Sequence, residues 1–587
     1  MDVSIPSFIE ENSDKLKARY LAWVYDLGQS TIQDSNTIST LKIRKNLSYW
    51  WMTPIAEKFN YSKSPQITDA LRLMAFDMWA NNHSIKELEI LSSHSELIDC
   101  LEKWSKSREL QFKVLKVERN TKKISFKKRI YSLFPREIRT IALFMLYLID
   151  RWPLRKVGLS KWRESTADVT FISYLFGLSS ENINDGKFES QYWAHLPDEL
   201  EKSFKKTRWL HMYVKDDRLP TSTDAAEYIN KLNIHAVNQV HTSLDSFLSI
   251  KIVWNTISEW KRLRIKIKNI DRDLARVTSE KLELWSLFQK EWQTSATGPG
   301  ILENLLILNL FESALSCVPE QSLGIYLFEQ QPWEMALIST WKTCDHKKIV
   351  GSQHTTMLFW DLRYFHDKRS YIKNNKLALP LPDELAVNGP RAMTMALDWH
   401  FPAPKLLESE ALRYLHLSNP TMRKSVISNN PTRFRLLVLT DYLESNVELQ
   451  MKILESAMPL VTERIEIVVK SHPNSPIADH KYNIPQMIID SSPIGELLAD
   501  CSVAFTSAAT SAAVDAYCTG VPVISLSNLN ELNLSPLRGL SEVTFINTAE
   551  ELAIQLDKLI LLDTKRCPSE KIFNLDTELT LWKKILQ

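Results

Sequence analysis

Polar side chains follow two short apolar runs in the last quarter of the chain. Runs such as 465–469 and 503–505 are typical of buried parallel strands, and ligands of open α/β sheets bind at the carboxyl edge of such strands. Hydroxyl groups and unpaired backbone N–H groups at a helix start suit an anion such as a phosphate. The residues predicted to bind a nucleotide phosphate are Lys470, Ser471, His472 and Pro473 after the first run, and Thr506, Ser507, Thr510 and Ser511 after the second.

His472 is the first candidate for chemistry in this group. A histidine at the carboxyl end of a strand can donate a hydrogen bond to a phosphate oxygen while a leaving nucleotide gathers negative charge. The alternative is a loop histidine with ordinary hydrogen bonds, and the hydroxyl residues could equally cap the helix predicted over 512–517. Function is favoured for His472 because both polar segments would meet at one sheet edge.

Carboxylates and a second histidine follow three other apolar runs, at 325–328, 348–350 and 436–439. Group transfer to a hydroxyl needs a general base, and either a carboxylate or an imidazole can serve. Spacing does not choose between them, and the acids could also be solvated loop residues or helix caps. The candidate catalytic residues are Glu329, Glu334, His354 and Asp441, and Gln353 is the candidate for binding the acceptor.

The sequence around these residues resembles a known family. A His-Pro pair after one strand, a Ser/Thr-rich turn after the next, and Gly520-Val-Pro-Val-Ile-Ser525 at a helix end are similar to the nucleotide-binding half of GT-B glycosyltransferases. More narrowly, they resemble bacterial surface-polysaccharide enzymes that use CMP-activated ulosonic acids. Upstream segments resemble the same surface-carbohydrate biosynthesis family, namely Tyr326-Leu-Phe-Glu-Gln-Gln-Pro-Trp-Glu334, Gly351-Ser-Gln-His354 and Leu381-Pro-Asp-Glu-Leu-Ala-Val-Asn-Gly389.

The resemblance implies a glycosyltransferase that moves a sugar from a CMP-linked donor to a surface polysaccharide or a lipid-linked glycan. The expected sugar is a nonulosonic acid of the pseudaminic, legionaminic or sialic type, or Kdo. Transfer is expected to be metal-independent and to need no cofactor besides the nucleotide-sugar substrate. Three alternatives stay open: a polyol-phosphate transferase that uses CDP-glycerol, an NDP-sugar 2-epimerase, and a non-catalytic scaffold of polysaccharide assembly.

The order of the apolar runs predicts an α/β fold. From Arg435 onward, strands alternate with helices, which is typical of a doubly wound parallel sheet. The resemblance implies the GT-B arrangement of two Rossmann-like domains facing a central cleft, with extra helices in the N-terminal half. The predicted units are an acceptor-side domain over 1–402, a nucleotide-sugar domain over 403–570, and a helix within 571–587 that crosses back to the first domain.

Composition limits the class of protein. A length of 587 residues, with 44% hydrophobic and 24% charged residues, is ordinary for two or three globular domains. A net charge of +2 gives no global sign of a nucleic-acid partner. The six cysteines show no Cys-x-x-Cys spacing and fit a reducing compartment. With no secretory segment at the N-terminus and no run of eighteen apolar residues, a cytoplasmic location is expected.

The segment 122–156 has two alternative roles. Lysines and arginines precede the apolar stretch 138–149, and Trp152, Arg155 and Lys156 follow it. Such a helix can lie in a membrane interface, which would place the protein peripherally at the inner face of the cytoplasmic membrane. The alternative is a core helix flanked by solvated lysines.

Two further segments have less bearing on the site. The run 250–254 is predicted to be a strand, and a long surface helix or helical hairpin is predicted between 260 and 292. Asp271-Arg-Asp273 has the form of a metal-binding Asp-x-Asp, but it lies in this charged helical stretch, so we attribute it to solvated surface.

Overall fold

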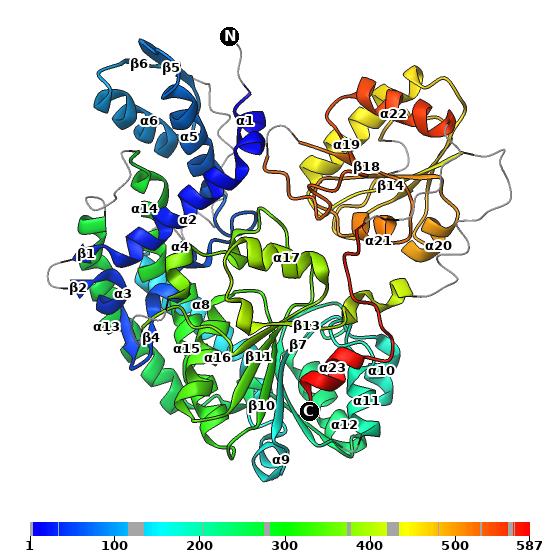
Figure 1. The fold of residues 1–587 in the computed structure, drawn as a ribbon. Helices are drawn as coiled ribbons and strands as arrows, with labels where there is room; N and C mark the ends of the chain where they lie inside the picture. Colours follow the sequence, from blue (N-terminus) through cyan, green and yellow to red (C-terminus); the bar gives the residue numbers. More distant parts are fainter. Residues whose placement is uncertain are drawn as a thin grey trace.

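The computed structural model describes residues 4–587 apart from 33–34, 116–133, 204, 275–281, 373–376, 419–433, 479–480, 529–530, 562–567 and 569. The chain forms two domains side by side, each built on one parallel sheet, and a block of helices adjoins the first (Figure 1). The predicted α/β class, with two Rossmann-like domains and extra helices in the N-terminal half, is confirmed.

The first sheet has seven parallel strands in the order β13-β12-β11-β10-β7-β8-β9. Its centre joins distant parts of the chain, because Val169 of β7 is the register partner of Leu323 of β10. All five residues of β10 are buried, as expected where helices cover both faces of a parallel sheet. The strands are β7 (Val169–Leu175), β8 (Thr207–Tyr213), β9 (Gln239–Ser243), β10 (Leu323–Leu327), β11 (Lys348–Ser352), β12 (Glu384–Val387) and β13 (Leu406–Glu408).

The second sheet has six parallel strands in the order β16-β15-β14-β17-β18-β19. Three of them, β14, β15 and β17, fall on the apolar runs 436–439, 465–469 and 503–505 named in the sequence analysis. The strands are β14 (Arg435–Leu439), β15 (Glu466–Lys470), β16 (Met487–Ile489), β17 (Val503–Thr506), β18 (Val523–Leu526) and β19 (Thr544–Ile546).

Helices separate most strands of both sheets. Their ends follow local sequence: Pro332 begins α16 at a position where its missing N–H costs nothing, and Gln331 and Glu334 form a capping box around that start. Helices between consecutive strands include α12 (Ser222–His235), α16 (Pro332–Thr343), α17 (Pro390–Asp398), α19 (Glu444–Ala457), α20 (Ile494–Ala499) and α21 (Ala512–Cys518), and α22 (Ala549–Leu561) follows the last strand.

The helical block contains a small pair of parallel strands, β5 and β6.

The same block includes the segment 250–254, which the sequence predicts to be a strand. This prediction is wrong, because Ile250 begins a long helix. Ile250 and Trp254 are four residues apart and share one exposed helix face, so the apolar run has helical and not strand period. The elements are α1 (Ile5–Glu11), α2 (Ser13–Gln29), α5 (Gln66–Ala80), β5 (Glu87–Leu91), α6 (Ser95–Ser107), β6 (Gln111–Leu115), α8 (Arg136–Arg151), α13 (Ile250–Leu274), α14 (Trp285–Thr297) and α15 (Pro299–Ser316).

The apolar stretch 138–149, within the segment 122–156, forms most of α8. Thr140, Phe144 and Leu148 are buried, so the core-helix alternative holds for one face of this helix. Leu146 and Ile149 on the other face are 62% and 66% exposed. Residues 122–133 of the segment lie outside the described residues. Among the described helices, none is long and apolar enough to cross a membrane.

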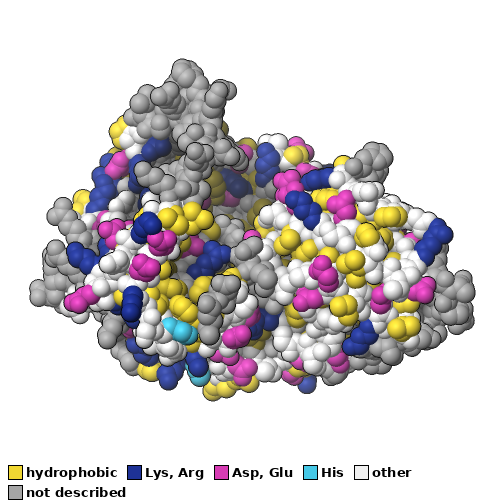
Figure 2. Space-filling view, turned by 90° about the horizontal axis from the view of Figure 1, so that it is seen from above, with side chains coloured by type: hydrophobic (Ala, Val, Ile, Leu, Met, Phe, Trp, Pro, Cys, Tyr) yellow, Lys and Arg dark blue, Asp and Glu magenta, His cyan; other side chains and the backbone are white. Residues whose placement is uncertain are grey.

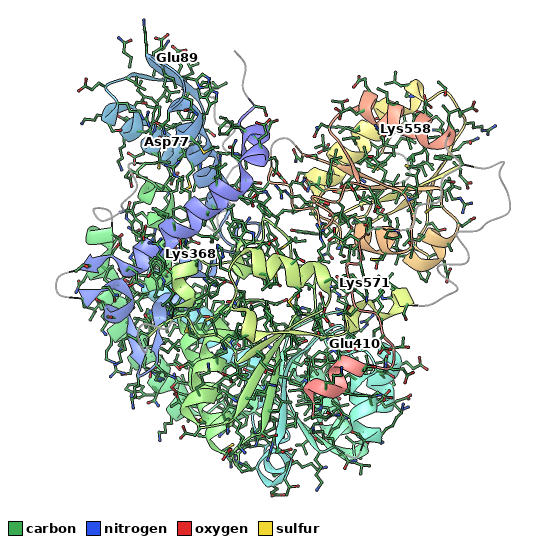
Figure 3. All side chains as sticks on the ribbon, in the orientation of Figure 1. Asp77, Glu89, Lys368, Glu410, Lys558 and Lys571 are labelled. Atoms are coloured by element: carbon green, nitrogen blue, oxygen red, sulfur yellow. The ribbon has the colours of Figure 1, made fainter. Side chains whose placement is uncertain are left out.

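The chain end packs on the first domain. Helix α23 (Thr580–Ile585) places Leu579 and Trp582 in a hydrophobic cluster with residues of β7 and β10. The Glu410 carboxylate, labelled in Figure 3, accepts hydrogen bonds from the backbone N–H groups of Leu581 and Trp582 at 2.6 and 2.9 Å. Along the sequence, the second domain therefore lies between two segments that both belong to the first domain.

Candidate functional site

The carboxyl edges of the two sheets face each other. Beyond β12, the carbonyl oxygen of Asn388 accepts a hydrogen bond from Asn574 N on the segment that returns from the second domain, at 3.0 Å. Beyond β18, Leu532 and Leu534 join the hydrophobic core of the first domain. Seen from above, the surface is hollowed between the two halves (Figure 2). Residues that follow these strands are therefore placed to meet one ligand.

His354 and Glu329 form a hydrogen-bonded pair at the edge of the first sheet. Glu329 follows β10 and His354 follows β11, and the adjacent strands bring His354 Nε2 to 3.3 Å from Glu329 Oε1. His354 is buried, and its Nδ1 has no partner among the described residues. In the neutral form of the ring with its proton on Nε2, toward the carboxylate, Nδ1 would carry a free lone pair. The pair has the form of an oriented general base.

The Glu329 carboxylate is kept ionised by its neighbours. Burial alone would raise its pKa, but the hydrogen bond and charge of His354, with the charge of Arg363, outweigh burial and lower the pKa of Glu329 to about 2. Tyr174 Oη on β7 donates to Glu329 Oε2 at 3.1 Å, and the Gln331 amide also donates to this oxygen. A fixed anion in this position stabilises an imidazolium that forms on His354.

Glu334 has a different role in the same loop. Its Oε1 accepts hydrogen bonds from the backbone N–H groups of Glu329 and Gln331, at 3.0 and 2.7 Å. The side chain is fully buried, and this burial raises the pKa of Glu334 well above its usual value. Glu334 holds the loop that carries Glu329, and its fully buried carboxyl group is poorly placed to reach an acceptor.

Gln353 and Asn388 hold the loop beside His354. Gln353 Nε2 and Asn388 Nδ2 both donate to the carbonyl oxygen of Thr355, at 2.9 and 3.0 Å. Gln353 Oε1 is buried and has no partner among the described residues. This amide oxygen is therefore available to accept a hydrogen bond from a ligand hydroxyl if the loop opens.

Tyr192 and Arg413 adjoin the histidine pair. The Tyr192 ring lies perpendicular to the His354 ring, with 5.0 Å between the centroids. Arg413 follows the first sheet, on the connection to the second, and its charge acts on the Tyr192 hydroxyl. The Arg413 guanidinium has no hydrogen-bond or ion-pair partner within the part of the chain that the structure describes, so it is available to an anionic ligand.

At the edge of the second sheet, Asp441 is the centre of a buried network. Its Oδ2 accepts from Ser507 Oγ at 2.5 Å and from Asn446 Nδ2 at 3.1 Å, while Oδ1 accepts from Leu443 N at 2.7 Å. These bonds tie the ends of β14 and β17 to the start of α19. Asp441 therefore shapes this edge, and Ser507 directs its hydroxyl proton to Asp441 in this arrangement.

His472 presents one ring nitrogen to solvent. Its backbone N–H donates to Thr440 Oγ1 at 2.9 Å, and its Nδ1 accepts from Asn474 N at 3.2 Å. This leaves Nε2–H as the donor of the neutral ring, without a partner among the described residues. Partial burial lowers the pKa of His472, against the opposing charge of Asp441. A neutral donor of this kind can bind a phosphate oxygen.

The other predicted phosphate residues divide into two groups. Lys470 Nζ donates to the carbonyl oxygens of Ser491 and Ser492, and Ser471 Oγ accepts from Ile477 N, so both hold the loop. Thr506 Oγ1 is buried and has no partner within the described part of the chain. Thr510 is buried, Ser511 is exposed at the start of α21, and Pro473 is exposed beside His472.

Tyr174, Tyr192 and Arg363 complete the environment of Glu329 and His354, and sequence reasoning missed them. Tyr174 lies on β7, Tyr192 follows the same strand, and Arg363 lies in the loop after β11. No spacing in the sequence relates them to Glu329. Only the pairing of β7 with β10 would have indicated that Tyr174 belongs to the site.

The comparisons with known proteins find similar folds at low identity. No protein-family model matches the chain, and no curated protein does. HepE of Anabaena in complex with UDP is 11% identical, covers 71% of this chain and 99% of its own, and has a TM-score of 0.37. The glycosyltransferase SnogD from Streptomyces nogalater is 12% identical, covers 72% and 100%, and has a TM-score of 0.34. A putative UDP-N-acetylglucosamine 2-epimerase from Listeria monocytogenes is 11% identical, covers 72% and 97%, and also has a TM-score of 0.34. TM-scores this low decide nothing about the function of this chain.

Proposed function

We propose that this protein is a GT-B glycosyltransferase that moves a sugar from a CMP-activated donor to a surface polysaccharide or a lipid-linked glycan. The single observation that carries sugar transfer is the His354–Glu329 pair at one sheet edge, opposite the polar edge formed by Asp441, Ser507 and His472 on the other sheet. One edge offers a general base, and at the other His472 offers a donor to a phosphate; these are the two requirements of glycosyl transfer from a nucleotide.

The proposed step follows from these positions. His354 Nδ1 takes the proton of the acceptor hydroxyl while the oxygen of this hydroxyl bonds to the anomeric carbon of the donor sugar. The bond between that carbon and the phosphate oxygen breaks, and its electron pair leaves with the nucleotide. Glu329 stabilises the imidazolium, and His472 Nε2–H stabilises the phosphate charge as it develops. Because His354 Nδ1 is covered in this arrangement, the loop that carries Tyr192 moves when the acceptor binds.

The donor assignment rests on the sequence resemblance of the segments around His472 and Ser507. A nonulosonic acid or Kdo carries a carboxylate beside its anomeric carbon. The unpaired guanidinium of Arg413 near His354 would suit this carboxylate, and this supports an acidic sugar over a neutral one.

Metal independence is part of the proposal. His472 Nε2–H and the hydroxyl of Thr506 or Ser511 offer hydrogen bonds to the leaving phosphate without an ion. Activity that survives dialysis against EDTA would support this assignment. Activity that is lost with EDTA and restored by Mg²⁺ or Mn²⁺ would contradict it, while leaving sugar transfer intact.

The first experiment is a calorimetric titration of the protein with CMP, CDP, UDP and GDP, alongside the His472→Ala variant. Selective binding of CMP that weakens about tenfold or more in the variant is expected, because one hydrogen bond to a charged phosphate is lost. Preference for UDP or GDP would overturn the CMP donor. If no nucleotide bound, the scaffold alternative would replace the enzyme.

A polyol-phosphate transferase that uses CDP-glycerol is the second candidate. The exposed apolar face of α8, flanked by exposed bases on α13, favours it, since acceptors of such enzymes are carried at a membrane. The same titration separates the two candidates: CDP would bind more tightly than CMP if the donor were a CDP-polyol. An NDP-sugar 2-epimerase would turn over its nucleotide sugar without any acceptor.

A further inference from the structure

Helix α8 exposes a continuous apolar face. Ile138, Ala142, Met145, Leu146 and Ile149 recur at the three- and four-residue spacing of one helix face, and all five are exposed. The opposite face, with Thr140, Phe144 and Leu148, packs into the helical block. A surface helix of a globular protein normally places polar side chains on its outer face, so five apolar ones in this position call for a partner.

Helix α13 adds tryptophan and unpaired bases next to this face. Ile250 and Trp254 are 79% and 71% exposed, and Ile265 is exposed farther along the same helix. Among the described residues, no hydrogen-bond or ion-pair partner is found for four exposed bases of this helix, whereas the exposed Lys268 pairs with Glu137. These bases are Lys251, Lys261, Arg262 and Lys266.

Acidic residues of the two helices do not balance these bases. Over residues 250–268, the only acid of α13 is Glu259, and its carboxylate pairs with Arg44 at 2.9 Å. The two acids of α8 are paired as well: Glu137 with bases of α13, and Asp150 with the arginine that follows it. The exposed side of this part of α13 therefore carries unbalanced positive charge.

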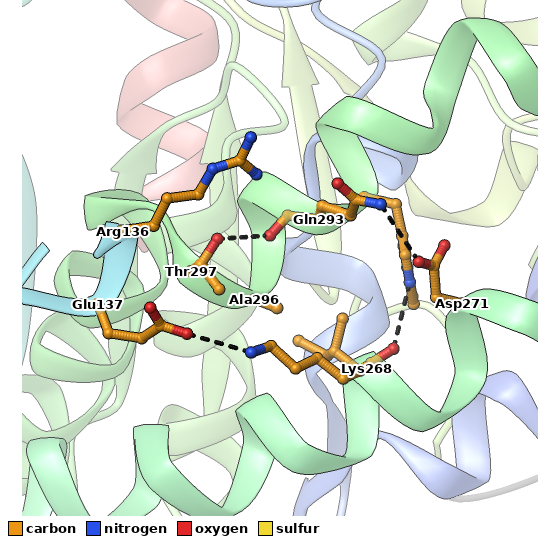
Figure 4. A pocket seen from close by; sticks show the side chains of 9 residues that line it. Arg136, Glu137, Lys268, Asp271, Gln293, Ala296 and Thr297 are labelled. Atoms are coloured by element: carbon orange, nitrogen blue, oxygen red, sulfur yellow. Dashed lines mark hydrogen bonds and ion pairs between the residues drawn. The ribbon is translucent and has the colours of Figure 1, made fainter. Parts of the chain in front are cut away.

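The two helices lie antiparallel, and contacts at both ends tie them together. At one end, Arg155 Nε, just beyond α8, donates to the carbonyl oxygen of Leu248, just before α13, at 3.2 Å. At the other end, Glu137 of α8 pairs with Arg264 and Lys268 of α13, at 3.3 and 3.1 Å. Figure 4 shows Glu137 reaching Lys268 beside a cavity of about 290 Å³ between α8, α13 and α14. The apolar face of α8 and the bases of α13 thus belong to one region of the surface.

We infer that this region, the α8–α13 surface, docks on a bilayer that contains anionic phospholipid. The apolar side chains of α8 would enter the boundary between headgroups and acyl chains, and Trp152 and Trp254 would lie at headgroup level. The bases of α13 would face the lipid phosphates, since each basic residue near an anionic surface adds to binding. The protein would lie on the membrane without crossing it.

Charge argues for a lipid surface over a second copy of this chain. A twofold dimer presents the same patch from both partners, so the unpaired bases of α13 would approach one another. Over residues 250–268, the single acid of α13, Glu259, is already paired with Arg44. An anionic bilayer supplies both an apolar layer and the opposite charge, and it therefore matches both parts of the surface.

The test is flotation of the full chain with vesicles of phosphatidylcholine, with and without phosphatidylglycerol. We expect binding to the anionic vesicles and little to the neutral ones. Lys261→Gln with Lys266→Gln should weaken the partition by about fivefold for each lysine removed. Leu146→Gln with Ile149→Gln should abolish binding, because the apolar anchor is lost.

Matched controls exist on the second domain. Ile554→Gln with Leu561→Gln removes exposed apolar residues of α22, and Lys558→Gln with Lys571→Gln removes two of the lysines labelled in Figure 3. These variants should float like the unaltered protein. Equal losses in test and control variants, or no binding to either vesicle, would overturn the inference. So would sedimentation showing a dimer that Leu146→Gln with Ile149→Gln converts to a monomer.

Discussion

Glu329 and Glu334 are five residues apart, yet the fold shifts the pKa values of their carboxyl groups in opposite directions. The charges of His354 and Arg363 lower the pKa of Glu329, whereas full burial raises the pKa of Glu334. The first is therefore suited to orient a base and to stabilise its cation, and the second is suited to hold the backbone of the loop.

Substitution of Glu334 should separate these roles. Glu334→Gln keeps a side-chain oxygen that accepts the hydrogen bonds of Glu329 N and Gln331 N. Turnover should therefore change by less than about threefold, as expected for a small perturbation. Glu334→Ala leaves both buried N–H groups unpaired and should cost about 1–3 kcal/mol of unfolding free energy. Kinetics and urea unfolding of both variants measure this. If Glu334→Gln were as inactive as Glu334→Ala, the carboxyl group would have a chemical role.

The pH dependence of stability gives a second check on Glu334. Its folded pKa is raised, so the stability that the protonated group contributes is present below about pH 4.5 and is lost as pH rises toward the folded pKa. Glu334→Gln removes this dependence. The melting temperature of the variant, relative to the unaltered protein, should therefore increase with pH above about 4.5. A difference in melting temperature that does not change with pH would contradict the raised pKa of Glu334.

The histidine pair should dominate turnover. His354→Ala and Glu329→Gln should each lower kcat by about 10²–10⁴-fold, because the first removes the base and the second removes the charge that stabilises its cation. His83→Ala, at an exposed position just beyond α5, is the matched control and should leave kcat unchanged. Transfer kinetics with a saturating donor make the measurement. Unchanged kcat in His354→Ala would exclude this residue as the base.

Ionisation of Glu329 also predicts a pH window for stability. Its folded pKa of about 2 lies below the ordinary glutamate value, so its contribution is present above about pH 4.5 and is lost as pH falls toward 2. The stability difference between Glu329→Gln and the unaltered protein should therefore be constant above about pH 4.5 and should shift below it. Thermal melts at several acidic pH values test this.

At the level of elements, strands β14, β15, β17 and β18 of the second domain were predictable because each is a short apolar run with a mostly buried pattern. The run 250–254 has similar residues but belongs to α13, and the exposed positions of Ile250 and Trp254 explain the error. The cap at Gln331-Pro-Trp-Glu334 could have been found from its spacing. The partners Tyr174 and Arg363 could not, because strand pairing across distant parts of the chain places them near Glu329.

Helix α23 should stabilise the domain on which it packs. Trp582 is fully buried, and its Nε1 donates to the carbonyl oxygen of Glu410 at 3.1 Å. Trp582→Ala should therefore lower the free energy of unfolding by about 3–5 kcal/mol. Trp254→Ala, at an exposed position of α13, should change it by less than about 0.5 kcal/mol in the absence of lipid. Urea unfolding followed by circular dichroism compares the two.

At the scale of the whole molecule, a second contact fixes how the domains approach. Arg538 Nε of the second domain pairs with Glu10 of α1 at 2.9 Å, and its guanidinium lies 4.0 Å from the centroid of the Phe359 ring. These contacts lie on the side where the carboxyl edges of the two sheets meet. They therefore join the two domains beside the hollow.

Arg538→Ala should loosen this arrangement more than it destabilises the fold. We expect a larger radius of gyration by X-ray scattering, with a change in unfolding free energy below about 1 kcal/mol, since the ion pair is partly exposed. Arg464→Ala, which removes a contact within the second domain, is the control. An unchanged scattering curve for Arg538→Ala would show that other contacts hold the domains together.

The packing of α23 also sets an order for biosynthesis. The hydrophobic cluster that includes Trp209, Ile325 and Trp582 cannot be completed until residues 579–586 have left the ribosome. The whole second domain is synthesised in between, so it can fold while the first still exposes a gap in its core. During that interval the first domain is a natural client for a chaperone, and a bulky fusion placed directly after Leu586 would interfere with its completion.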